Sequence, residues 1–303
     1  MGDVTLDSIL EMQNSDVESR LHTVLGAGLK KLLGDRARDP APVPLWLPKY
    51  FNLDKTKAFK NASEEQRANI ISGSSQALLE EALYIEQSGM AYAAKMSIMA
   101  DTIEERMLYG LFAADETTHY HQVRQFLPEQ GRSCEPSEFH SLLSSLIQEG
   151  DRESLVFVIQ VVLEGWGLTH YRSLAQGCQS EEFTEVLKSI LRDEARHHGS
   201  GVILCRDRGL PDASRDYVNQ ILTTFLYMVQ LGPQSVLSAV EQATGGLTRS
   251  QKLELFNELD GTAQSQERLN LLKGLMQEDG FTEVADYLES KGSFKAMRAE
   301  ECI

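Results

Sequence analysis

Proline and cysteine are scarce in this sequence, and long apolar runs are absent from it. Its 8 prolines and 22 glycines among 303 residues exclude a collagen-like or low-complexity chain. Four cysteines without paired spacing predict reduced thiols rather than a disulfide framework or a zinc site. The longest apolar run, 155–163, is interrupted by Gln160 and is far shorter than the roughly 20 residues that cross a bilayer. We therefore expect no membrane partner.

Basic residues are also scarce. The chain has 29 lysines and arginines against 45 acidic residues, which gives a net charge of −16. Such a surface repels phosphate backbones, so we expect no nucleic-acid partner. The first ten residues lack a basic segment followed by an apolar block, which argues against a secretory signal and predicts a cytoplasmic location. The apolar share of 42% is large enough for a buried core and excludes disorder.

Helical periodicity runs through almost the whole chain. Apolar residues recur every three to four positions, as in amphipathic helices. Ser63, Thr102, Asp151 and Ser180 are candidate N-caps that begin four long helices. The β-branched run 156–162 is ambiguous, but its length and the spacing of its neighbours favour helix. We predict an all-α fold.

Three segments are expected along the chain. Residues 1–60 form an N-terminal helix and a proline-rich arm, 61–210 form a helical bundle, and 211–303 form a helical extension packed on the bundle. Half of the prolines cluster around Trp46 and predict an extended conformation there. These prolines are Pro40, Pro42, Pro44 and Pro48.

The chemistry lies in a repeated pattern of acidic residues and histidines. The motif D-E-x-x-H occurs at 115–119 and again at 193–197. On a helix, residues three apart share a face, so each motif directs a carboxylate and an imidazole to one place. Glu86 and Glu164 each lie 30 residues before the glutamate of a motif, on otherwise apolar helix faces.

Six such side chains converging in an apolar interior predict a metal site. An unpaired carboxylate costs several kcal/mol to bury, and two divalent cations would compensate nearly all of this charge. Carboxylates with imidazoles suit iron, with manganese as the other choice, whereas a structural zinc site favours thiolates. The predicted ligands are Glu86, Glu116, His119, Glu164, Glu194 and His197. Glu81 is the alternative to Glu86.

The segment 63–208 resembles the ferritin-like di-iron carboxylate oxygenases and oxidases, whose members carry E…DExxH…E…DExxH. The resemblance implies a ferritin-like four-helix bundle with one iron for each set of two glutamates and a histidine. It further implies that Glu116 and Glu194 bridge the metals. By the same likeness, Asp115 and Asp193 accept the N–H of a histidine on the opposite helix pair and so set its tautomer.

The function that this resemblance implies is an O2-dependent di-iron oxygenase. Such an enzyme oxidises a small organic substrate by hydroxylation, N-oxygenation or C–C cleavage through a peroxo-di-iron intermediate. A ferredoxin and its reductase would supply electrons to a monomer or homodimer. Val123 stands where ribonucleotide reductase small subunits have a radical tyrosine, and Ile190 where arylamine N-oxygenases have another histidine. No branch is therefore assigned, and a ferroxidase or iron-handling protein without an organic substrate is the alternative.

Gly165 and Gly167 flank Trp166 directly after the predicted ligand Glu164. Glycine within a helix costs about 1 kcal/mol relative to alanine, so two glycines at this place need an explanation. They either leave space for substrate or dioxygen, or allow another helix to approach closely. The sequence does not separate these explanations.

Overall fold

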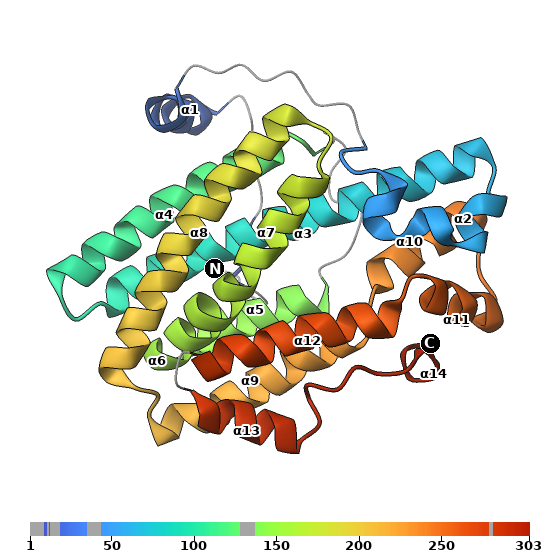
Figure 1. The fold of residues 1–303 in the computed structure, drawn as a ribbon. Coiled ribbons are helices and arrows are strands. Elements are labelled where there is room, and N and C mark those ends of the chain that lie inside the picture. Colours follow the sequence, from blue (N-terminus) through green and yellow to red (C-terminus); the bar gives the residue numbers. More distant parts are fainter. Residues whose placement is uncertain (1–8, 11, 13–18, 35–43, 128–136, 279–280) are drawn as a thin grey trace, which may run out of the picture. The chain divides into compact units, whose positions relative to one another are not determined.

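A computed structural model describes residues 9–10, 12, 19–34, 44–127, 137–278 and 281–303 (Figure 1). The prediction of an all-α fold is confirmed, because the regular elements of these residues are all helices. Within this part of the chain, β structure is limited to an isolated bridge between Trp46 and Cys178. The chain divides into two compact units, 1–40 with 80–149 and 41–79 with 150–303. The expected division into three segments stays a prediction.

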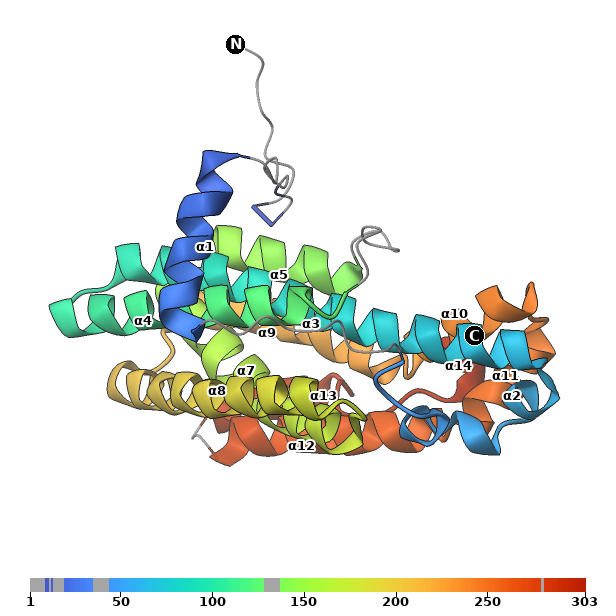
Figure 2. The same ribbon diagram turned by 90° about the horizontal axis from the view of Figure 1, so that it is seen from above.

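The first unit contains the C-terminal part of the long helix α3 together with three other helices. Lys95 on α3 donates to the backbone carbonyls of Ile147 and Gln148, at 2.8 and 3.2 Å, and so ties α3 to the end of α5. Helix α1 contacts α4 (Figure 2). The bounds are α1 Arg20–Leu33, α3 Glu64–Met99, α4 Ile103–Arg124 and α5 Glu138–Glu149.

The second unit is built around two antiparallel neighbours, α7 and α8 (Figure 1). Helices α9, α12 and α13 pack together beside them. The bounds of the α-helices are α2 Lys57–Asn61, α6 Arg152–Leu155, α7 Glu164–Gly177, α8 Glu181–Arg208, α9 Asp212–Gln230, α10 Gln234–Thr244, α11 Arg249–Glu258, α12 Gly261–Glu278, α13 Thr282–Ser290 and α14 Ala299–Cys302. The other helical elements are η1 Pro48–Phe51, η2 Leu53–Lys55 and the π-helix η3 Val156–Leu163.

The four expected N-caps are confirmed. The side-chain oxygen of each cap accepts a hydrogen bond from the backbone N–H three residues later, at 2.8 to 3.2 Å. Ser63 and Gln66 form a complete capping box, because the Gln66 side chain also accepts from the backbone of Ser63. These local bonds satisfy N–H groups that a helix leaves without intrahelical partners, which is why the cap pattern locates helix starts correctly.

The helix expected from Asp151 onward is not uniformly α-helical. It comprises α6, the π-helix η3 and α7, and the backbone N–H of Glu164 donates to the carbonyl of Ile159, five residues earlier. The prediction of helix rather than strand for 156–162 is therefore confirmed, but these residues form a π-helix instead of the expected α-helix. All seven of these residues are buried, so the α-helical spacing used to assign a face to Glu164 does not apply before that residue.

The proline-rich arm follows the prediction only in part. Pro40 and Pro42 lie outside the described residues. Trp46 is extended, since it forms the bridge to Cys178, and its indole N–H donates to the carbonyl of Leu174 at 3.0 Å. From Pro48 onward the extended prediction is wrong, because this proline begins the 3-10 helix η1. Proline fits the first position of a helix, where no intrahelical N–H bond is needed.

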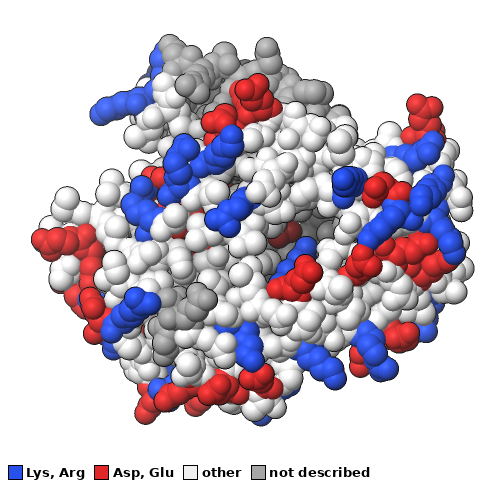
Figure 3. Space-filling view, viewed as in Figure 1, with Lys and Arg blue, Asp and Glu red and all other residues white. Residues whose placement is uncertain are grey.

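Charged side chains are interleaved at the end of the second unit where α2 and α11 lie (Figure 3). Lys57 pairs with Glu254 at 2.5 Å, and Lys55 pairs with Asp260. These contacts connect the residues before and within α2 to α11 and the turn that follows it. Among the described helices, none has both the length and the apolar composition needed to cross a membrane.

Candidate metal centre

The first unit brings together Glu86, Glu116 and His119. Glu86 comes from α3, and the other two lie one turn apart on α4. Their candidate ligand atoms lie within 4.8 Å of one another. Glu86 Oε2 is 3.1 Å and Glu116 Oε2 is 3.9 Å from His119 Nδ1. All three side chains are buried, and Glu86 is 0% exposed. We call these residues the first triad.

The buried surroundings of the Glu86 carboxyl group favour a bound cation. Burial raises the pKa of Glu86 to about 7, the hydrogen bond to His119 opposes this shift, and the negative charge of Glu116 adds to it. Two carboxylates and an imidazole that are buried together are costly without a compensating charge. A divalent metal ion would supply that charge, and this buried Glu/His group could hold one.

Gly89 creates the space for one of these carboxylates. It lies one turn after Glu86 on α3. A Cβ atom at this position would be 2.5 Å from Glu116 Oε2 and 2.6 Å from Glu116 Cδ. Any side chain here would displace the Glu116 carboxylate or the backbone of α3.

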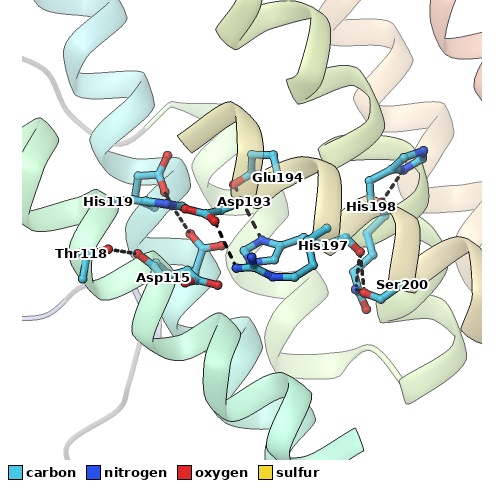
Figure 4. Close-up of polar contacts among 12 residues, drawn as sticks. Asp115, Thr118, His119, Asp193, Glu194, His197, His198 and Ser200 are labelled. Atoms are coloured by element: carbon cyan, nitrogen blue, oxygen red, sulfur yellow. Dashed lines mark hydrogen bonds and ion pairs between the residues drawn. The ribbon is translucent and has the colours of Figure 1, made fainter. Parts of the chain in front are cut away.

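The second unit brings together Glu164, Glu194 and His197, which we call the second triad. Glu164 is the first residue of α7, and the others lie one turn apart on α8 (Figure 4). Their candidate ligand atoms also lie within 4.8 Å of one another, with His197 Nδ1 3.8 Å from Glu194 Oε1. His197 is 0% exposed, whereas Glu164 is only partly buried.

Gln160 fixes the backbone around this triad. Its side-chain amide donates to the carbonyl of His197 at 2.9 Å and to Ser200 Oγ at 3.2 Å. In return, His198 Nδ1 donates to the backbone carbonyl of Gln160 at 3.0 Å, since a carbonyl can only accept (Figure 4). These reciprocal bonds join the π-helix η3 to α8 at the level of the triad.

Two glycines allow this close approach. A Cβ atom at Gly201 would lie 2.3 Å from the Cβ of Gln160, and one at Gly165 would lie 2.9 Å from Cε1 of His198. Gly165 is therefore explained by close helix packing. Close packing does not explain Gly167, because among the described residues no neighbouring atom lies within 4 Å of a Cβ placed there, and its role as space for substrate or dioxygen stays a prediction.

The six predicted ligands thus form two triads within the described residues, and Glu86 rather than Glu81 belongs to the first. Asp193 pairs with Arg196 at 3.2 Å, and the backbone carbonyl of Asp115 accepts from Thr118 at 2.9 Å. The expected contacts of these aspartates with histidines stay predictions. So does the joining of the two triads into one dinuclear centre.

Four residues near the triads were not anticipated from the sequence. They are Gly89, Gln160, His198 and Gly201. Only Gly89 could have been found from the sequence. Each residue of the second triad follows its counterpart in the first by 78 positions, and this interval relates Gly89 to a second glycine. Gly167 follows Gly89 by the same interval.

Comparisons of the chain with protein-family models, with curated proteins and with solved structures find no match.

Proposed function

We propose that this protein is an O2-dependent non-haem di-iron oxygenase that oxidises a small organic substrate. The observation that carries the proposal is the pair of triads, each with two carboxylates and one imidazole in the interior of a helical unit. Oxygen and imidazole ligands suit iron or manganese. In this proposal α3, α4, α7 and α8 form a ferritin-like four-helix bundle that joins the triads into one dinuclear site.

The protein residues would bind and orient the metals. Glu86, Glu116 and His119 would hold one ion, and the second triad would hold the other. When bound, the metal pair would supply electron transfer to dioxygen. For hydroxylation the overall balance is RH + O2 + 2 e⁻ + 2 H⁺ → ROH + H2O, with a ferredoxin and its reductase as the electron source.

Neighbouring residues support these roles. Gln160 and His198 would keep His197 in register with Glu164 through their reciprocal hydrogen bonds. Phe112, one turn before Glu116, is 1% exposed and would help to exclude water from the first triad. Excluding water strengthens the electrostatic interactions of the ligands and protects reactive species from hydrolysis.

Iron stoichiometry tests the metal centre directly. Apoprotein is loaded anaerobically with Fe(II), desalted and assayed for iron. We expect two irons per wild-type chain and fewer in Glu116→Gln and Glu194→Gln. The matched controls Glu104→Gln and Glu185→Gln replace exposed glutamates on the same two helices and should retain both irons. A folded wild-type protein that binds no iron overturns the proposal.

Oxygen chemistry separates an oxygenase from the iron-handling alternative. An oxygenase should elute as a monomer or homodimer and consume dioxygen in proportion to an oxidised organic product. A cage-sized assembly that oxidises Fe(II) in large excess over the protein, without an organic substrate, would instead establish iron storage.

A further inference from the structure

Helix α1 of the first unit has an apolar face that the rest of the protein leaves largely uncovered. Its leucines and valine recur three, four or seven positions apart, so they share one side of the helix. Leu29 is the buried residue of α1, and Leu33 beside it is partly covered. The other apolar side chains of this face are 46 to 70% exposed, namely Leu21, Val24, Leu25 and Leu32.

The packing of α1 explains why this face is uncovered. The helix contacts α4, which it crosses at a steep angle instead of lying alongside it (Figure 1, Figure 2). Two helices that cross in this way touch near one point, so the turns on either side of the contact receive little cover. One flank of α1, at Leu29, is therefore held against the protein while most of its apolar face meets solvent.

The charges of α1 are all of one sign. Arg20, Lys30 and Lys31 are its charged residues, and none of its residues is acidic, in a chain whose net charge is −16. Residues four and seven apart share a side of a helix, so Arg20 and Lys31 both border Val24. An exposed apolar face bordered by basic residues is typical of a helix that lies in the surface of an anionic lipid bilayer.

The size of α1 favours a lipid surface over a protein partner. Fourteen helical residues are about 21 Å long and about 10 Å wide, which gives this face roughly 200 Å² in projection. A standard protein interface buries about 800 Å² on each partner. A groove that encloses a helix would need the flank that Leu29 holds against the protein. In a second copy, the basic ends of α1 would meet basic ends.

Another set of exposed apolar residues in the first unit differs in charge. Ile103 and Met107 on α4 are 66% and 65% exposed, but the first turn of this helix contains Glu104 and Glu105. An anionic lipid surface would repel these glutamates. Charge therefore distinguishes α1 from α4, and α4 offers a control that is matched in apolar exposure.

We propose that α1 is a docking site for an anionic phospholipid surface. Leu21, Val24 and Leu32 enter the boundary between headgroups and acyl chains, and Arg20 and Lys31 contact the anionic headgroups. The expectation of no membrane partner rested on the lack of a spanning segment, and a helix that lies on a bilayer needs no such length. Acidic residues more than about 10 Å from the lipid surface are screened by salt.

Vesicle sedimentation with the full-length protein tests the apolar contact. The probe is a vesicle of phosphatidylcholine and phosphatidylserine, and the bound fraction is measured in the pellet. Leu21→Gln combined with Val24→Gln should weaken binding about tenfold or more, because both side chains lose their apolar contact with lipid. Ile103→Gln combined with Met107→Gln is the matched control and should bind like wild type.

A second pair of variants tests the charge. Arg20→Gln combined with Lys31→Gln should weaken binding about tenfold or more, since each basic residue near an anionic surface adds to the attraction. Lys49→Gln combined with Arg67→Gln replaces two exposed basic residues of the second unit and should have no effect. Wild type should bind phosphatidylcholine vesicles weakly, and high salt should reduce binding to the anionic vesicles.

The following results would overturn the inference. Wild type does not bind the anionic vesicles, or the variant with Leu21→Gln and Val24→Gln binds them equally well, or the α4 control loses as much binding. A lower mass of that α1 variant than of wild type, by sedimentation equilibrium without lipid, would assign the face to a second copy. If the variant does not fold, Leu32→Gln decides by the same comparison. The iron count of each α1 variant should equal that of wild type, so the proposed metal centre is tested separately.

Discussion

Glu116 and Gly89 are in such close contact that a methyl group on Gly89 would lie 2.5 Å from the Glu116 carboxylate oxygen. The two residues come from different helices, α4 and α3, and the glycine is what lets the carboxylate lie against the backbone of α3. The position of one predicted metal ligand therefore depends on the absence of a side chain elsewhere.

We expect Gly89→Ala to displace Glu116 and weaken iron binding at the first triad. Overpacking of this kind costs about 1–3 kcal/mol of stability, whereas alanine in an open helical position stabilises. Gly110→Ala on α4 is the matched control and should be neutral or stabilising, because no neighbouring atom of the described residues lies within 4 Å of a Cβ placed there. Urea denaturation and iron counting provide the readouts. Full iron binding with raised stability in Gly89→Ala would show that Glu116 is not constrained in this way.

Gln160→Leu should lower stability by about 1–3 kcal/mol, because it removes two hydrogen bonds from a buried site. The loss of the bond to the His197 carbonyl should also weaken iron binding at the second triad. Gln220→Leu, an exposed change on α9, should alter neither property. Equal unfolding free energies and iron counts for Gln160→Leu and Gln220→Leu would refute this role.

Metal uptake should depend on pH through Glu86. Its pKa is raised to about 7 in the metal-free protein, so the carboxyl group is protonated in mildly acidic solution and must lose this proton to bind a cation. Affinity should therefore increase with pH, and binding near pH 6 should release more protons than binding near pH 8. Calorimetry with Mn(II) in buffers of different ionisation enthalpy measures this release. A proton count that is independent of pH would contradict the expectation.

The same shift predicts how the metal-free protein responds to pH. In the folded state Glu86 holds its proton up to about pH 7, whereas its ordinary pKa is 4.5. Between these values the folded state binds more protons than the unfolded state, so the free energy of unfolding decreases as pH rises. Glu86→Gln should remove this contribution, so the free energy of unfolding of the variant should fall less, or rise more, with pH than that of wild type, as measured by denaturation across the interval. An unchanged slope in the variant would exclude Glu86 as its origin.

His170 should change the stability in the opposite direction over an overlapping pH interval. Burial lowers the pKa of His170 to about 4, and the positive charge of Arg268 contributes. Between pH 4 and 6.5 the unfolded state binds a proton that the folded state rejects, so stability decreases as pH falls through this interval. Stability profiles of wild type and His170→Phe should diverge there. Parallel profiles would contradict the assignment.

Much of the helical architecture and the glutamate–histidine pair of each E-x-x-H motif could be predicted because their signals are local. Ser63, Asp151 and Ser180 cap helices through bonds that span three residues, and E-x-x-H places its two side chains on one face through the helical repeat. These relationships depend on the chain within one or two turns. The sequence by itself therefore determined the all-α class, the starts of the long helices and the pairing of a glutamate with a histidine in each E-x-x-H motif, whereas Glu86 and Glu164 were inferred from their offset of 30 residues before these motifs.

Only the tertiary structure decided what surrounds the triads. Gln160 and His198 are 38 residues apart and bond to each other because η3 and α8 pack together. Gly165 and Gly167 both flank Trp166, and the sequence does not distinguish them. A Cβ at Gly165 would contact His198, whereas no neighbouring atom of the described residues lies within 4 Å of a Cβ at Gly167. Such differences arise from which atoms of distant segments occupy a given volume. No local pattern of apolar, polar and glycine residues contains that information.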